Sequence, residues 1–366
     1  MEPRKLGFID SLRGFAALYV LVFHFSAITT PHAVAPQWLA HFADLGGSGV
    51  TLFFLLSAFT LCLSSESRKD EEGSPLLNFY IRRFFRIAPL FYAWIVIYCI
   101  RDKIIFGVVH SPAEVASSLF FVFNLSPGNE QGFVWASWTL GVEMIFYVFF
   151  PFIFKLASNL GRAFALLLFS FLLRWVWHFS VPHLIDDQAI AAAYYSLSVL
   201  RHLPTFIFGI VAYRIYVVID MSRARQIGAG EAMFAAGAFA LLAVAYGVFS
   251  VDSFEGLTIE SYIYSAMLIG LAITSPRWFV NPITRFYGKI SYSVYLSHAT
   301  TLFVMSRIFV FVYEHFTSIA IPYIFSLGIG IAVVTVISSL TYWFIEIPGN
   351  KLGRRLIDAI QKPIAI

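Results

Sequence analysis

Residues 321–345 read IPYIFSLGIGIAVVTVISSLTYWFI, a stretch without a single charged side chain. A helix needs about 20 mainly apolar residues to cross the ~30 Å hydrocarbon core of a bilayer, so this stretch is predicted to span a membrane. Nine similar stretches precede it, at residues 12–30, 46–65, 84–106, 138–157, 162–180, 197–219, 230–250, 258–275 and 291–313. Together they predict an all-α membrane protein with about ten transmembrane helices.

The composition of the whole chain supports this fold class. Of its 366 residues, 59% are hydrophobic and 13% are charged, and the mean hydropathy is +0.77. Soluble domains are about half apolar and about a quarter charged. The composition excludes a disordered chain, a secreted disulfide scaffold and most cytosolic enzymes, which leaves a polytopic membrane helical bundle.

The positive charges indicate how the chain is oriented. Cytoplasmic loops of membrane proteins are enriched in Lys and Arg. With a cytoplasmic N-terminus, ten spans place only Arg101 and Lys103 in the outer segments, and segment 111–125 on that side is expected to form an interfacial or re-entrant helix. We therefore expect both termini in the cytoplasm, one transmembrane domain over residues 1–350 and a short basic tail over 351–366. The same bias explains the pI near 9.0, so no nucleic acid is expected as a partner.

Arg13 and His24 stand out on the first span because charged and polar groups inside a bilayer are costly and mark functional cavities. Eleven residues correspond to three helical turns plus about 20°, so both side chains project from one face, about 16 Å apart along the axis. His24 would lie near mid-membrane, where an imidazole can accept a proton. The alternatives are a positive-inside anchor for Arg13 and a packing role for His24.

Glu143 is a second polar group in an apolar segment. It lies about 7 or 8 Å deeper than Trp138, which is expected to anchor the helix at the outer interface. A carboxylate at that depth must be protonated, paired or hydrogen-bonded, and it could reach His24 across a bundle. A structural salt bridge to Arg174, Arg201 or Arg307 is the alternative.

Arg83 and Arg86 share a helix face at the expected cytoplasmic mouth, because they are three residues apart. Paired guanidinium groups suit the phosphates of a cytosolic cofactor. Headgroups of inner-leaflet lipids attract the same residues and are the alternative partner.

A polar stripe opens the ninth span. Ser291, Tyr295 and His298 fall on one helix face and are expected to point inward, with Tyr292 beside them. Hydrogen bonding between helices alone could explain this stripe.

The stretch GGSG at residues 46–49, upstream of Ser57, permits close backbone approach between helices. No strand precedes it and no Lys follows it, so it is not a phosphate-binding loop.

Six motifs, in this order, resemble those of the acyltransferase-3 family of integral membrane acyltransferases over nearly the whole chain. They are FIDSLRGFAALYVLVFH, GGSGVTLFFLLSAF, RRFFRIAP, SWTLGVEMIFYVFFP, GKISYSVYLSH and FIEIPGNKL. Arg13 and His24 fit the family's signature of Arg, ten residues and His. Ala58 replaces a Gly that the family usually has, and Thr139 replaces a Ser.

The resemblance implies transfer of an acyl group, commonly acetyl from acetyl-CoA, to a hydroxyl of a carbohydrate. It implies a bacterial inner membrane, a cell-surface or secreted glycan as acceptor, and glycan-biosynthesis proteins as possible partners. No metal is expected, since the sequence shows no ligand cluster at metal-binding spacing.

These expectations combine into one mechanistic hypothesis. Acyl-CoA binds near Arg83 and Arg86 with help from Arg13, and its thioester reaches His24. His24 is either the general base for the acceptor hydroxyl, oriented by Glu143, or the carrier of the acyl group. Further candidates for contacts with substrate or tunnel are Ser57, Trp138, Ser291, Tyr292 and His298.

Two other function classes remain open at this point. Intramembrane His, Glu and Arg also form proton and solute pathways, so a proton-coupled transporter of a small polar solute is the alternative. A catalytically silent scaffold or flippase partner is the third class.

Overall fold

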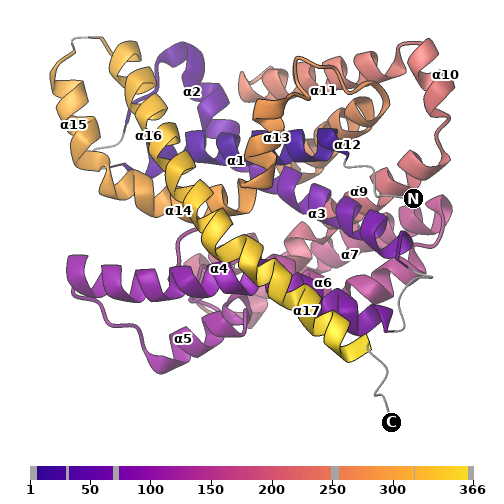
Figure 1. Cartoon of the computed structure of the whole chain (residues 1–366), viewed down its shortest axis with the longest axis horizontal. Coiled ribbons are helices and arrows are strands. Elements are labelled where there is room, and N and C mark those ends of the chain that lie inside the picture. The colour runs from indigo at the N-terminus through magenta and orange to yellow at the C-terminus, as the bar shows by residue number, and fades with distance from the viewer. Residues whose placement is uncertain (1–5, 30–32, 69–73, 249–254, 317, 362–366) are drawn as a thin grey trace. The chain divides into compact units, whose positions relative to one another are not determined.

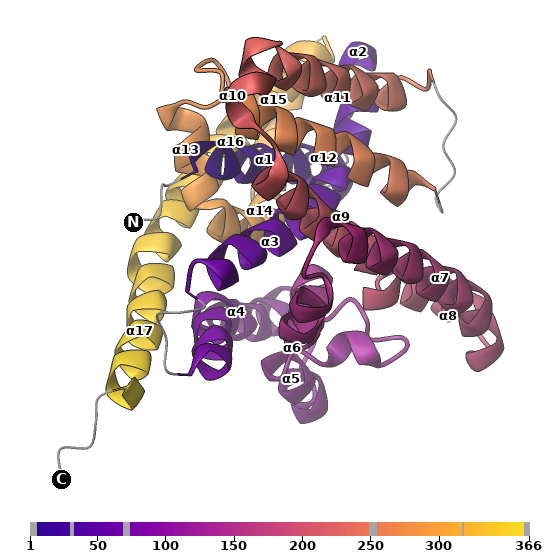
Figure 2. The same ribbon diagram turned by 90° about the vertical axis from the view of Figure 1, so that its right-hand side faces the viewer.

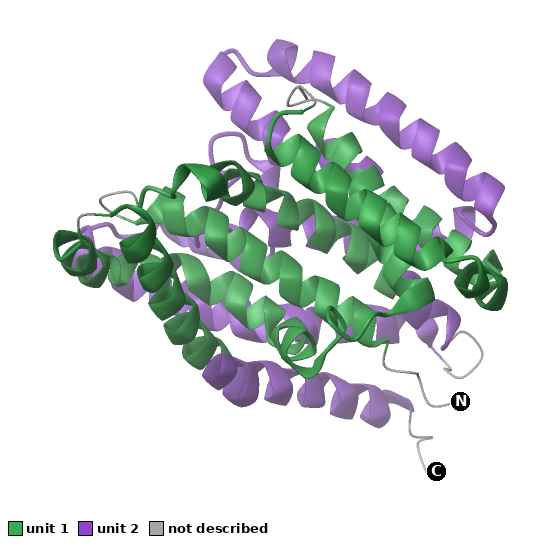
Figure 3. Ribbon diagram, turned by 90° about the horizontal axis from the view of Figure 1, so that it is seen from above, with its two compact units in different colours: residues 1–60, 205–338 green, residues 61–204, 339–366 purple. Residues whose placement is uncertain are grey.

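The computed structural model describes residues 6–29, 33–68, 74–248, 255–316 and 318–361, and their regular structure is entirely helical (Figure 1). The chain divides into two compact units (Figure 3). Unit 1 comprises residues 1–60 and 205–338, and unit 2 comprises residues 61–204 and 339–366. The fold class predicted from the sequence, an all-α polytopic bundle, is confirmed.

Unit 1 is built around α1, which packs against α13 and α14. Within this unit α11 and α12 run side by side (Figures 1 and 2). Its helices are α1 (Gly7–Ile28), α2 (Gln37–Asp44), the 3-10 helix η1 (Leu45–Ser48), α10 (Met221–Gln226), α11 (Ala229–Ala245), α12 (Gly256–Thr274), α13 (Pro282–Lys289), α14 (Ser291–Val304) and α15 (Ser306–Glu314).

Unit 2 contains the longest single α-helix, α4, against which α17 packs. Its helices are α4 (Pro75–Ile105), α5 (Pro112–Leu119), the 3-10 helix η2 (Phe123–Leu125), α6 (Trp138–Leu156), α7 (Leu160–Leu184), α8 (Gln188–Ser196), the π-helix η3 (Tyr342–Glu346) and α17 (Ile347–Gln361). The boundary between the units falls within α3 (Gly49–Glu66), α9 (Val199–Val218) and α16 (Ala320–Thr341).

Within the described residues, each of the ten apolar stretches is mainly helical, but not all are equally suited to crossing a bilayer. In the described part of the chain, eight helical segments are long and apolar enough to do so. A ninth candidate is the pair α14 and α15, which is bent by 54° at Met305, and the remaining stretch is the shorter helix α11. Segment 111–125 forms the short helix α5 and η2, as expected for a segment that does not cross. The number of spans, the cytoplasmic termini and the assignment of 351–366 as a tail stay predictions, although residues 351–361 continue the helix α17.

Glycines allow the helices around α1 to approach backbone to backbone. A Cβ atom on Gly46 would lie 2.4 Å from the Tyr19 carbonyl oxygen, and one on Gly49 would lie 2.7 Å from the Ala16 carbonyl oxygen. The close approach predicted from the stretch GGSG therefore occurs, and it is made with α1. Small residues serve this purpose in membrane bundles, where packing rather than the hydrophobic effect holds helices together.

Replacing Gly288 by alanine is expected to loosen the crossing of α13 with α1. The added Cβ would lie 1.8 Å from the Asp10 carbonyl oxygen, which is backbone and cannot rotate away. Overpacking of this kind costs about 3 kcal/mol of stability, which thermal unfolding of the purified protein in detergent would show as a lowered Tm. The matched control is Gly328→Ala, because no atom lies within 4 Å of that site. An unchanged Tm for the Gly288 variant would contradict the tight crossing.

Candidate functional site

His24 is in direct contact with a second histidine. Its Nδ1 atom lies 3.0 Å from Nε2 of His298, and the two ring centroids are 4.8 Å apart. The same Nδ1 atom lies 3.1 Å from the carbonyl oxygen of Val20, one turn earlier on α1. His24 is half-buried, whereas His298 on α14 is 1% exposed. Both residues belong to unit 1, and their positions in the sequence are 274 residues apart.

The contacts of His298 determine where the protons lie on both rings. Nδ1 of His298 is 2.7 Å from the carbonyl oxygen of Tyr295, and a carbonyl can only accept, so this nitrogen carries the hydrogen. In a neutral imidazole the other nitrogen, Nε2, then presents a lone pair. Because that lone pair faces His24, the hydrogen between the rings belongs to Nδ1 of His24. The lone pair of neutral His24 therefore lies on Nε2.

Nε2 of His24 is the atom of this pair that can accept a proton or attack an electrophile. Within the described residues no hydrogen bond reaches it. A nitrogen lone pair on a ring that is fixed by its other nitrogen is what a general base or a nucleophile requires. The same logic applies to metal-free catalytic histidines in general, where a partner on one nitrogen selects the tautomer.

The stripe predicted on the ninth span is buried. Ser291 is 3% exposed and Tyr292 is half-buried. The ring of Tyr295 packs edge-on against Phe53 and also contacts the ring of His298. The structure thus brings His298, which the sequence ranked only as a possible tunnel residue, next to His24.

Arg13 lies at the other end of the same face of α1. Its guanidinium group donates to Thr60 Oγ1 over 3.3 Å, and Thr60 in turn donates to the carbonyl oxygen of Ser57 over 3.0 Å. Arg13 and the backbone of Ser57, two predicted site residues, are therefore linked through the side chain of Thr60 on α3 in unit 1.

In unit 2, the predicted residues Arg83 and Glu143 meet at the same tyrosine. Tyr147 donates a hydrogen bond to the Glu143 carboxylate one turn away on α6. The Arg83 guanidinium carbon lies 6.0 Å from the centre of the Tyr147 ring and 5.8 Å from that of Phe79. The sequence analysis did not single out Tyr147, although its spacing of four residues from Glu143 was visible.

Trp138 is the first residue of α6. Its ring packs against His202 with centroids 5.2 Å apart, and its carbonyl oxygen accepts from Asn124 over 3.0 Å. Arg86, the other predicted donor-binding residue, is half-buried on α4, three residues beyond Arg83.

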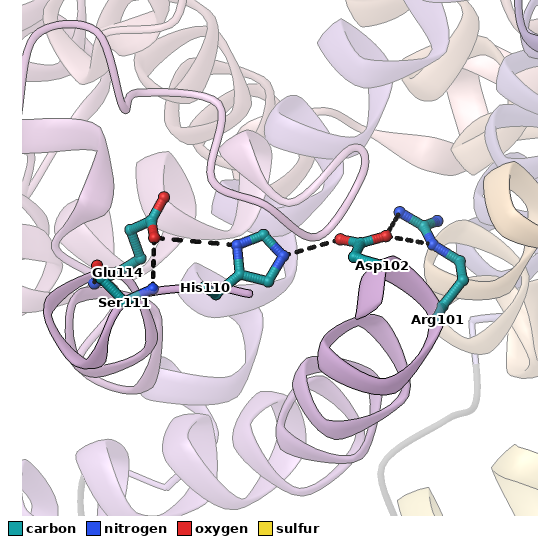
Figure 4. A network of polar contacts seen from close by, with 5 residues as sticks. All are labelled: Arg101, Asp102, His110, Ser111 and Glu114. Carbon is teal, nitrogen blue, oxygen red and sulfur yellow. Dashed lines mark hydrogen bonds and ion pairs between the residues drawn. The ribbon is translucent and has the colours of Figure 1, made fainter. Parts of the chain in front are cut away.

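A second polar cluster in unit 2, shown in Figure 4, joins the end of α4 to the start of α5. Asp102 is bound by Arg101 on one oxygen, at 2.6 and 2.7 Å, and by Nε2 of His110 on the other, at 2.8 Å. Nδ1 of His110 lies 4.0 Å from Glu114, and the ring stacks on Phe133 with centroids 4.1 Å apart.

This cluster differs from the His24 pair in its chemistry. Both nitrogens of His110 face carboxylate oxygens, so neither presents a lone pair to a substrate. The backbone N–H of Ser111 donates to Glu114 over 2.7 Å and lowers the pKa of that carboxyl, which keeps the charge at the start of α5. The arrangement suits a structural role, in which these polar contacts hold the end of α4 against the start of α5, rather than a catalytic site.

The sequence analysis also missed a carboxylate within a predicted span, Glu260 on α12. It accepts a hydrogen bond from Thr51 over 2.5 Å. One turn later Tyr264, which is fully buried, is hydrogen-bonded to Ser48 over 2.6 Å. These contacts connect α12 with η1 and α3 inside unit 1. The signal was an acidic residue within an apolar stretch, the same signal that pointed to Glu143.

Across the described residues, no three His, Cys, Asp or Glu side chains come together as a metal site. In unit 1 these side chains offer acid–base and nucleophilic chemistry at His24 and a cationic group at Arg13. Unit 2 separately offers cationic groups at Arg83 and Arg86.

The comparisons with known proteins point to one reaction class. A sequence model described as an acyltransferase domain, of the acyltransferase-3 type, matches residues 6–343. The O-acetyltransferase OatA of Staphylococcus aureus (strain NCTC 8325 / PS 47) is 24% identical over 99% of this chain and 60% of its own length. A second protein named as an O-acetyltransferase, SACOL0978 of Staphylococcus aureus (strain COL), is 21% identical over 98% of this chain and 59% of its own length. The chain therefore spans about three fifths of the length of these relatives. No solved structure matches the chain.

Proposed function

The chain belongs to the acyltransferase-3 family of acyltransferase domains, and we propose that this multi-pass membrane enzyme transfers an acetyl group from acetyl-CoA to a hydroxyl of a carbohydrate. The relatives named as O-acetyltransferases support acetyl as the acyl group and an oxygen as its acceptor. Their bacterial origin supports a bacterial cell membrane as the location and a surface glycan, with its biosynthetic proteins, as the setting.

The observation that carries the proposal is the hydrogen-bonded pair of His24 and His298. It leaves the lone pair of His24 on Nε2, where it can act in either of two ways. As a general base, Nε2 takes the proton of the acceptor hydroxyl while the oxygen attacks the thioester carbon. The C–S bond then breaks, and the CoA thiolate takes up the proton from Nε2. As a nucleophile, Nε2 attacks the thioester carbon, the C–S bond breaks and CoA leaves as the thiolate, so that Nε2 holds the acetyl group. The acceptor oxygen then attacks this acetyl group, the N–C bond breaks, and the hydroxyl proton passes to the CoA thiolate.

His298 takes the role of orienting His24 in this proposal. It binds Nδ1, the nitrogen opposite the reactive one, as the carboxylate does in a Ser-His-Asp triad. The orienting role first expected of Glu143 stays a prediction. Its hydrogen bond from Tyr147 supports a carboxylate that is held in place within unit 2.

The proposed function is tested by measuring covalent transfer of an acetyl group to a glycan. Membranes that contain the protein are incubated with acetyl-CoA labelled in its acetyl group, and label is sought in the glycan fraction. We expect incorporation that mild alkali releases as acetate, which identifies an ester. CoA labelled in its adenine ring serves as the control and should leave the glycan unlabelled. Uptake of an unmodified solute without acetyl transfer would support the transporter instead.

Arg83 and Arg86 are proposed to bind the phosphates of the donor. Replacing Arg86 by alanine is expected to raise KM for acetyl-CoA about tenfold with a smaller change in kcat, because a hydrogen bond to a charged phosphate contributes about 1.5 kcal/mol or more. The measurement is acetyl transfer at increasing donor concentration. Lys103→Ala, at the other end of α4, is the matched control. An unchanged dependence on acetyl-CoA would assign the arginine pair to lipid headgroups.

A further inference from the structure

The last helix of the described chain, α17, has one face committed to packing. Gly349 and Gly353 let it approach α4 closely: a Cβ on Gly349 would lie 2.7 Å from the Pro89 ring, and one on Gly353 would lie 2.7 Å from Cβ of Phe85. Ile357, one turn further on, is also buried. This face is occupied within unit 2.

Two other faces of α17 are exposed and differ in character. An apolar stripe, with one residue per turn beside the packed face, consists of Leu352, Leu356 and Ile360, which are 55%, 39% and 47% exposed. The opposite side of the helix carries Lys351, Arg354, Arg355 and Asp358, all exposed. At 100° per residue, the middle of this charged face lies about 150° from the middle of the apolar stripe. A helix with an apolar stripe and a basic opposite face is typical of the membrane–water interface.

The length of the preceding helix places α17 at that interface. The chain reaches α17 through α16, which ends at Thr341, and the π-helix η3. At 1.5 Å per residue, about 20 helical residues cross the ~30 Å hydrocarbon core. The 22 residues of α16 suffice to cross the core, and Trp343 and Phe344, which are 63% and 73% exposed, follow directly. Exposed aromatic residues at a helix end anchor it at the headgroup level.

The positive charges of α17 indicate that it binds acidic headgroups of the membrane lipids. α17 carries three basic residues against one acid on its exposed charged face. Its glycine face packs on α4 at Phe85 and Pro89, so this basic face stays exposed within unit 2. Clusters of Lys and Arg just beyond a transmembrane helix bind acidic phospholipid headgroups, each contributing about 1 kcal/mol.

We propose that α17 lies in the headgroup layer and binds anionic phospholipids. Its stripe of Leu352, Leu356 and Ile360 contacts the upper acyl chains, and Lys351, Arg354 and Arg355 bind the phosphates. The lipid contact does not depend on acetyl transfer. α17 also lies beyond residue 343, where the match to the acyltransferase domain ends.

The first experiment measures the depth of α17 in the whole protein. Spin labels are placed singly at positions 351 to 360 in a Cys62→Ser, Cys99→Ser background, and the protein is reconstituted in nanodiscs containing 30% phosphatidylglycerol. We expect labels at 352, 356 and 360 to collide with oxygen, which concentrates in lipid, and labels at 351, 355 and 358 to collide with a water-soluble nickel complex. Equal access of the nickel complex to all positions would overturn the proposal. Protection of the stripe from both reagents would also overturn it, because a protein partner or second copy would then cover the stripe.

The second experiment tests the lipid chemistry. Arg354→Gln combined with Arg355→Gln should lower the preference of the protein for spin-labelled phosphatidylglycerol over phosphatidylcholine by about fivefold per charge removed. Lys103→Gln removes one exposed charge at the distal end of α4 and should leave the preference unchanged. An unchanged preference in the double variant would contradict the proposal. The proposal would also be contradicted if the double variant had a higher KM for acetyl-CoA than the unaltered protein in nanodiscs of phosphatidylcholine alone. Arg354 and Arg355 would then bind the donor.

Discussion

Replacing His24 by alanine is expected to lower acetyl transfer by about 10²- to 10⁴-fold while leaving insertion into the membrane unchanged, because the variant lacks the nitrogen that moves the proton or carries the acetyl group. The transfer assay with labelled acetyl-CoA measures the rate, and the amount of protein in the membrane fraction measures insertion. His315→Ala is the matched control, since His315 is an exposed histidine at the end of α15 in the same unit.

Two results would separate the possible roles of His24. Residual transfer within about tenfold of the unaltered protein would remove His24 from catalysis, because a general base contributes at least about 10²-fold. If His24 carries the acetyl group, brief incubation with labelled acetyl-CoA and no acceptor should label the protein itself, and His24→Ala should abolish that label. Absence of label in the unaltered protein would favour the general base.

Replacing His298 by leucine is expected to lower kcat about 100-fold with KM for both substrates nearly unchanged. Leucine fills a similar volume but cannot accept the hydrogen of His24 Nδ1, so the ring is held only by the carbonyl oxygen of Val20. The tautomer and the orientation of His24 are then less well defined, which affects the reaction step more than binding.

His298→Gln distinguishes this positioning role from a purely structural one. The glutamine side-chain oxygen can accept the hydrogen of Nδ1, so most of the lost kcat should return. The positioning role of His298 would be contradicted if neither His298→Leu nor His298→Gln gave folded protein. It would also be contradicted if the two variants had equal kcat. A change in KM for acetyl-CoA alone would place His298 in donor binding instead.

The helices could be predicted from the sequence because their signal is local. The stretch at residues 138–157 became α6, Trp138–Leu156, and the stretch at 258–275 became α12, Gly256–Thr274, because about 20 apolar residues form a helix wherever they meet a bilayer. The break at Met305 between α14 and α15 had no such signal, since no Pro or Gly marks it.

The candidate site could be predicted only in part. The spacing of Arg13 and His24 identified the face of α1, and the stripe on α14 identified the face that includes His298. That these two faces meet, so that His298 binds His24, depends on packing between residues 274 positions apart, which spacing along one helix does not determine. The sequence analysis expected Glu143 to orient His24, which stays a prediction, and it did not foresee the second imidazole that the structure places on Nδ1.

The chain of hydrogen bonds through the two imidazoles also limits the path of a proton. A hydrogen on Nδ1 of His24 can pass to His298, but the next acceptor is the backbone oxygen of Tyr295, which cannot take up a proton and release it elsewhere. A proton therefore cannot leave the histidine pair through His298. Whatever proton Nε2 gains from an alcohol must depart from Nε2 again, with the thiol product as its natural destination, before the next catalytic cycle can begin.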